Sequence, residues 1–156
     1  MKEKLAILGG EKSFRLEVSS YNSIGTEEVS AAQEVVKSGI LSQFLGEWDA
    51  DFYGGPKVKE FENNWSEFFK IKHSISVNSN TSGLMVALGA IGLEPGDEVI
   101  VSPWTMSASA TSILVWNGIP VFADIEPETF NLDPISIEKN ITKYTKAIVV
   151  TNIFGH

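Results

Sequence analysis

Cysteine is absent from this chain, and histidine occurs only twice, at His73 and His156. The absence of cysteine excludes disulfides, thiol nucleophiles and thiolate metal ligands. Because the two histidines lie far apart in the sequence, they do not have the spacing of a zinc-binding pair, and we predict no metal site.

Long apolar runs are also absent. The first ten residues contain only the run Leu5-Ala6-Ile7-Leu8, which is too short for the apolar core of a signal peptide. No stretch approaches the roughly 20 apolar residues of a membrane-spanning helix. We therefore expect a cytoplasmic protein with no membrane partner.

Basic side chains are in the minority, with 12 Lys and Arg against 20 Asp and Glu and a formal net charge of -8. This balance argues against nucleic acid as the main partner. A small anion is still compatible with it, because backbone N–H groups at a helix start bind anions regardless of net charge. The length of 156 residues and the 43% of hydrophobic residues indicate a globular protein with one domain of ordinary size.

The N-terminal third is polar, with two predicted helices. Thr26 is the expected cap of a helix through Lys37, since two acidic residues follow it. Residues 41–55 are predicted as loop, and Pro56 fits the first turn of a helix over 57–69. Five apolar residues of this second helix recur at helical spacing and are interpreted as core: Val58, Phe61, Trp65, Phe68 and Phe69. We accordingly divide an N-terminal helix and loop segment, 1–55, from residues 56–156.

From residue 74 onward, short apolar runs alternate with helical patterns. The predicted strands are 74–77, 98–101, 119–123 and 146–151. The predicted helices are 83–91, 105–116 and one that begins at Pro134 after the cap Asp133. Such alternation predicts an α/β fold, a parallel sheet with flanking helices. Ligands of such sheets bind outside the carboxyl ends of the strands.

The polar run 78–83 follows the first predicted strand and leads directly into a helix. Free N–H groups at a helix start favour a phosphate, and the hydroxyls of Thr81 and Ser82 are further donors. Asn, Ser and Thr are also the ordinary capping residues, so the pattern alone leaves both interpretations open.

The residues after the other strands give weaker indications of a catalytic or cofactor-binding role. Trp104 and Met106 are interpreted as core in preference to contacts with a flat cofactor. Asp124 and Glu126 are interpreted as loop charges beside Pro127 in preference to an acid–base pair. His156 is expected to have no role.

Several runs, taken together, are similar to one known family. They are Gly55–Glu62, Val77–Leu84, Glu94–Val101, Pro120–Ile125, Thr145–Val150 and Phe154–Gly155. In this order and spacing the chain resembles the DegT/DnrJ/StrS sugar aminotransferases along nearly its whole length. The run from Val77 is similar to that family's Asn-Ser-Gly-Thr-Ala-Ala-Leu phosphate loop.

This resemblance implies the type I fold of aminotransferases that use pyridoxal 5'-phosphate (PLP), with residues 56–156 forming an incomplete PLP-binding large domain. It also implies a homodimer. The implied reaction moves an amino group from glutamate or glutamine to a keto-sugar or keto-cyclitol, as in polysaccharide biosynthesis.

Carried over by position, the implied cofactor-binding residues are Asn80, Thr81, Ser82 and Met106. Asn80 replaces the usual loop glycine, and asparagine tolerates a positive φ better than most residues. Met106 falls where the family has an aromatic ring that stacks on the cofactor, and its thioether gives a softer contact.

The resemblance further implies that the lysine forming the Schiff base lies beyond His156, so that no catalytic residue is expected in this chain. The alternative is a catalytically inactive, truncated relative that acts as a binding or folding module. A dinucleotide-binding Rossmann domain is disfavoured because residues 78–83 contain a single glycine, and the Gly-Lys-Ser/Thr ending of a P-loop is missing.

Overall fold

The computed structural model describes residues 4–12, 14, 16–17 and 19–156. The chain forms two compact units, Met1–Phe61 and Glu62–His156, and each is described by itself. The predicted segment 1–55 includes residues 1–3, 13, 15 and 18, which lie outside the described residues. Within the described part of the chain, every helix is too short or too polar to cross a membrane.

The first unit contains short 3-10 turns at Ala6–Leu8 and Ala50–Tyr53, the helix α1 over Thr26–Ser38 and the start of α2. The prediction that Thr26 caps α1 is wrong. Thr26 is the first helical residue, and the cap position belongs to Gly25, whose N–H donates to the Glu28 carboxylate at 2.7 Å. This bond lowers the pKa of the Glu28 carboxyl below its ordinary value, because it stabilises the ionised form.

Helix α2 spans Pro56–Phe69, as predicted, but its apolar stripe is not core. Phe61, Trp65, Phe68 and Phe69 are each between 47% and 79% exposed. The ring of Phe69 lies 4.6 Å from that of Trp65 and 4.9 Å from that of Phe68. An apolar stripe on a helix shows only that one face of the helix is suited to burial. Whether that face is buried depends on another element that packs against it.

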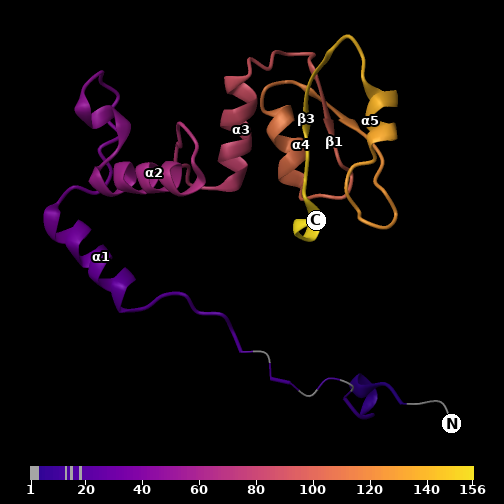
Figure 1. Cartoon of the computed structure of the whole chain (residues 1–156), viewed down its shortest axis with the longest axis horizontal. Coiled ribbons are helices and arrows are strands. Elements are labelled where there is room, and N and C mark those ends of the chain that lie inside the picture. The colour runs from indigo at the N-terminus through magenta and orange to yellow at the C-terminus, as the bar shows by residue number, and fades with distance from the viewer. Residues whose placement is uncertain (1–3, 13, 15, 18) are drawn as a thin grey trace. The chain divides into compact units, whose positions relative to one another are not determined.

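The second unit has the predicted α/β architecture (Figure 1). Its elements are α3 (Asn80–Ala90), β1 (Glu98–Val101), α4 (Ser107–Leu114), β2 (Ile119–Phe122), α5 (Pro134–Asn140), β3 (Thr145–Val149) and a 3-10 turn at Ile153–Gly155. The three strands are parallel in the order β2-β1-β3. Asp133 caps α5 as predicted, and its side chain accepts the N–H of Ile135 at 2.9 Å.

The central strand β1 is buried on both faces. Val99 and Val101 pack with Leu88 of α3 and Ile113 of α4. On the opposite face, Ile100 packs with residues that follow β2, namely Ala123 and Leu132, and Ile137 of α5 lies against that cluster. Helices therefore cover both sides of a parallel sheet, the arrangement that such sheets require.

The predicted strand 74–77 is wrong, because the segment forms no strand and pairs with none in the described part of the chain. Side chains of α2 hold it instead. The Glu62 carboxylate accepts both the N–H and the hydroxyl of Ser76, at 2.7 and 2.8 Å. The hydroxyls of Ser66 and Ser74 lie 2.8 Å apart. The segment thus gains the hydrogen bonds that an adjacent strand ordinarily supplies.

Helix α3 packs closely on the end of α4. The indole N–H of Trp116 donates to the carbonyl of Met85 at 2.9 Å. A Cβ at Gly89 would lie 2.3 Å from the Trp116 ring, so this contact requires glycine. The packing fixes the position of α3, and with it the start of the helix.

We predict that Ile100→Ala lowers the free energy of unfolding by about 2–5 kcal/mol, because Ile100 is fully buried on one face of β1. The matched control is Ile148→Ala. Ile148 pairs with Ile100 in the β1–β3 register but is 42% exposed, so its loss is expected to be smaller. Urea unfolding followed by circular dichroism measures both, and equal losses would contradict the assigned core.

Candidate functional site

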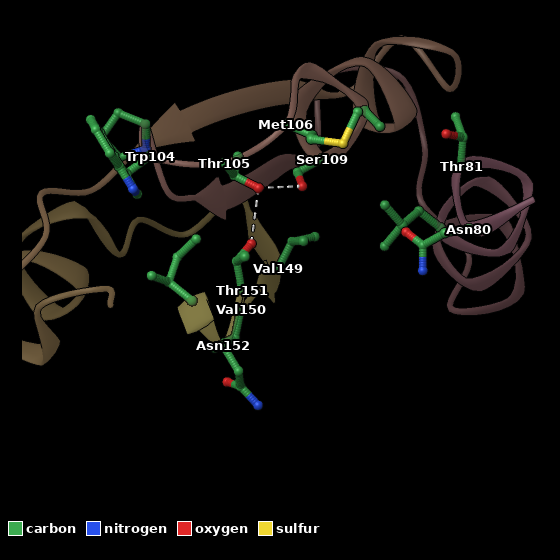
Figure 2. Close-up of a pocket in the computed structure, with 14 residues that line it drawn as sticks. Asn80, Thr81, Trp104, Thr105, Met106, Ser109, Val149, Val150, Thr151 and Asn152 are labelled. Atoms are coloured by element: carbon green, nitrogen blue, oxygen red, sulfur yellow. Dashed lines mark hydrogen bonds between the residues drawn. The ribbon is translucent and has the colours of Figure 1, made fainter. Parts of the chain in front are cut away.

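A pocket of about 930 Å³ lies at the carboxyl ends of β1 and β3, beside the start of α3 (Figure 2). Its lining is predominantly apolar and contains neither lysine nor an acidic side chain. The lining residues are Asn80, Thr81, Leu84, Pro103, Trp104, Thr105, Met106, Ala108, Ser109, Val149, Val150, Thr151, Asn152 and Ile153. The pocket therefore occupies the edge of the sheet at which the sequence predicted a ligand.

The start of α3 presents unpaired donors to this pocket. Ser79 is the N-cap, and its hydroxyl oxygen accepts the N–H of Ser82 at 3.1 Å. The Ser79 carbonyl accepts the N–H of Gly83 at 3.1 Å. Within the described residues, the N–H groups of Asn80 and Thr81 have no hydrogen-bond partner, and both residues line the pocket. Such free N–H groups at a helix start favour an anion.

Ser82, unlike Asn80 and Thr81, does not line the pocket. Its hydroxyl donates to the Asn78 side-chain oxygen at 2.6 Å and lies 3.0 Å from the Ser79 hydroxyl. Ser82 is not among the lining residues, so its side chain stabilises the turn into α3. Asn80 is the first residue of α3 and does not have the positive φ that its comparison with a loop glycine suggested.

Trp104 and Met106 are exposed by 51% and 77%, so the prediction that they fill the core is wrong. Both line the pocket instead. Met106 comes immediately before α4, while Trp104 lies against Phe130 with 5.4 Å between ring centroids. Two apolar side chains of the pocket lining therefore come from the same short loop after β1.

Hydroxyl groups join the loop after β1 to the loop after β3. The Thr105 hydroxyl lies 2.9 Å from that of Ser109 in α4 and 3.1 Å from that of Thr151. Farther along, the Asn131 side-chain oxygen accepts the N–H of Ile153 at 3.0 Å. These bonds hold together loops that lie far apart in the sequence.

The remaining predicted candidates lie outside the lining. Asp124 is exposed, and the Glu126 carboxylate accepts the Thr129 hydroxyl at 2.9 Å, which agrees with the interpretation of both as loop residues. The ring of His156 lies 3.4 Å from the Asn131 amide nitrogen. No group of three acidic or histidine side chains suited to a metal ion occurs in the part of the chain that the structure describes.

Sequence reasoning missed Thr105, Ser109, Thr151 and Asn152 as lining residues. Thr105 and Asn152 follow predicted strands and Thr151 is the last residue of one, and this position at the strand ends was the available signal. Their residue types gave none, since Thr, Ser and Asn are ordinary at the ends of strands and helices.

The family description that matches this chain is the DegT/DnrJ/EryC1/StrS aminotransferase family, over residues 22–156. The spore coat polysaccharide biosynthesis protein SpsC of Bacillus subtilis is 42% identical over 132 residues, covering 85% of this chain and 31% of that protein. The 3-oxo-glucose-6-phosphate:glutamate aminotransferase of the same organism is 39% identical over 104 residues, covering 67% of this chain and 24% of that protein.

Among solved structures, the PLP form of the putative sugar aminotransferase Spr1654 from Streptococcus pneumoniae superposes with a TM-score of 0.72. It is 32% identical, and the match covers 81% of this chain and 29% of that one. The match thus spans less than a third of the length of each of these three relatives.

We predict that Glu62→Ala speeds hydrogen exchange of the Ser76 N–H by roughly ten- to a hundredfold, because a charge-assisted hydrogen bond is lost. Glu67→Ala on the same helix is the control, since the Glu67 side chain is exposed and takes no part in that bond. Amide exchange followed by NMR measures both. Unchanged protection of Ser76 in Glu62→Ala would mean that Glu62 does not hold the segment before α3.

Proposed function

The chain belongs to the DegT/DnrJ/EryC1/StrS aminotransferase family, and we propose that it forms the phosphate-binding part of the cofactor site in a PLP-dependent sugar aminotransferase. The observation that carries the proposal is the pair of unpaired N–H groups of Asn80 and Thr81, which open into the pocket at the start of α3. The family uses PLP, and the PLP form of a related enzyme supports the assignment.

The described residues fit such a cofactor in charge and in shape. The helix start attracts a phosphate through its N–H groups and its partial positive charge. No acidic side chain lines the pocket to oppose an anion, although the chain as a whole is acidic. Leu84 and Met106 give the lining apolar surfaces suited to a flat ring.

The four residues that the resemblance implied take three roles. Asn80 and Thr81 donate their backbone N–H groups to the phosphate, and the Thr81 hydroxyl donates a further bond. Ser82 shapes the turn through its bonds to Asn78 and Ser79. The Met106 thioether packs against the ring. PLP, when bound, supplies the electron sink that amino transfer requires.

For the whole protein we propose amino transfer from glutamate or glutamine to a keto-sugar or keto-cyclitol, carried out by a homodimer. A glutamate-dependent aminotransferase that acts on 3-oxo-glucose-6-phosphate supports this substrate class. We also propose that residues 1–55 form an N-terminal helix and loop segment and that residues 56–156 belong to the large PLP-binding domain.

A second candidate is a binding module without catalytic activity. It is favoured by one observation, the absence of lysine from the residues that line the pocket. Amino transfer through PLP uses a lysine amine as nucleophile and base. In the first candidate, that lysine comes from outside the pocket lining described above.

We predict that Thr81→Ala weakens binding of pyridoxamine phosphate about ten- to a hundredfold, because one hydrogen bond to a charged group is lost. Pyridoxamine phosphate is the suitable probe, since it has no aldehyde to react with surface lysines. NMR titration of the 15N-labelled chain measures the affinity. Thr111→Ala is the control, since Thr111 is exposed on α4 outside the pocket. Equal affinities would mean that the Thr81 hydroxyl takes no part in binding the phosphate.

We also predict that residues 1–156 alone, supplied with PLP and glutamate, release no 2-oxoglutarate above the rate of free PLP. The reason is the missing lysine in the pocket lining. A coupled dehydrogenase assay measures the product. Sustained turnover by the purified chain would overturn this prediction and would require a catalytic base that lies elsewhere in it.

A further inference from the structure

Three hydroxyl groups form a continuous hydrogen-bonded chain in the wall of the pocket. The Thr105 hydroxyl is the central member, 2.9 Å from that of Ser109 and 3.1 Å from that of Thr151. All three residues line the pocket, where most of their neighbours are apolar. Figure 2 shows the three side chains converging, with Asn80 and Thr81 on another side of the pocket. We refer to Thr105, Ser109 and Thr151 as the hydroxyl chain.

Counting protons shows that the hydroxyl chain has one donor left over. Each hydroxyl has one proton to donate and two lone pairs that accept. The two hydrogen bonds within the hydroxyl chain use two of the three protons, whichever way they run. Among the residues that the structure describes, none of the three hydroxyls has another partner. One proton therefore remains available to an acceptor from outside the protein.

We propose that the hydroxyl chain is a polar subsite that donates this hydrogen bond to an acceptor atom on the ring of the bound ligand, its phenolic oxygen or its ring nitrogen. The inference rests on the proposed function, in which the start of α3 takes the phosphate. Because the N–H groups of Asn80 and Thr81 serve that end, the hydroxyl chain serves the unphosphorylated part of the ligand.

The position of the hydroxyl chain is well defined, which suits a group that orients a ligand. Ser109 is only 6% exposed and belongs to α4, and Thr105 stands close after the fully buried end of β1. Thr151 follows β3 by two residues, beside the backbone that Asn131 holds at Ile153. A hydroxyl fixed from three elements loses little conformational freedom when it binds a ligand.

The test compares three probes: pyridoxamine phosphate, pyridoxamine and inorganic phosphate, each titrated by NMR into the 15N-labelled chain. Thr105→Val keeps the shape of the side chain and removes the central hydroxyl. Because the Ser109 and Thr151 hydroxyls then lose the partner that orients them, it is expected to weaken both pyridoxamine compounds about two- to tenfold and to leave inorganic phosphate unchanged. Thr105→Ser is expected to restore binding, because it returns the hydroxyl.

Thr111→Val, on the exposed face of α4, is the matched control and should change none of the three affinities. Thr151→Val removes the terminal hydroxyl and is also expected to weaken the binding of pyridoxamine. It therefore tests the subsite if Thr105→Val does not fold. Unchanged pyridoxamine affinity in both folded variants would overturn the subsite.

The probes also separate this inference from the proposed function. If the unsubstituted chain binds inorganic phosphate but not pyridoxamine, the hydroxyl chain is no ligand subsite, while the anion site of α3 stands. If it binds none of the three probes, the proposed function fails and the subsite fails with it. A loss of pyridoxamine binding in Thr105→Val that is rescued in Thr105→Ser supports both.

Discussion

Burial of the short strand β1 on both faces is the constraint on which the second unit depends. Its three consecutive apolar residues, Val99, Ile100 and Val101, are fully buried, and they point alternately to opposite faces of the sheet. One face requires cover from α3 and α4, the other from α5 and the residues after β2. Because a parallel strand cannot reach its neighbour through a tight turn, the connecting helices α4 and α5 also cover the two faces of the sheet.

The same arrangement builds the pocket. The carboxyl ends of β1 and β3 lie at one edge of the sheet, so the loops that leave them are neighbours although about fifty residues separate them. Side-chain contacts then fix these loops to each other and to the loop after β2: Thr105 with Thr151, Trp104 with Phe130, and Asn131 with the backbone at Ile153. Phe130 keeps a φ of 61°, a conformation that non-glycine residues rarely adopt. Such backbone is stable only where its surroundings hold it.

The approach to α3 is held by side chains. Segment 74–77 has the alternation of a strand, yet its hydrogen bonds come from Glu62 and Ser66 of α2. The proposed anion-binding residues, Asn80 and Thr81, begin three residues after Val77. Their position therefore depends on two attachments: the α2 side chains before them and the packing of Trp116 against Gly89 after them. Neither attachment touches the pocket, and both act through the position of the helix start.

The sequence by itself determined the alternation of helices and strands, because local periodicity and capping report directly on local structure. β1 ends at the predicted residues, Pro56 begins α2, and Asp133 caps α5. The motifs also determined the family, since they depend on residue order alone. The sequence further indicated the edge of the sheet at which the pocket lies.

Only the tertiary structure decided what each face and each hydroxyl contacts. The stripe on α2 and the pair Trp104 and Met106 are apolar, and the sequence could not tell core from pocket wall or open surface. Whether segment 74–77 is a strand depends on a neighbouring strand, which local pattern does not report. The bond between Thr105 and Thr151 joins residues 46 positions apart. Burial and pairing are relations between distant segments, and for that reason they become defined only when the chain is folded.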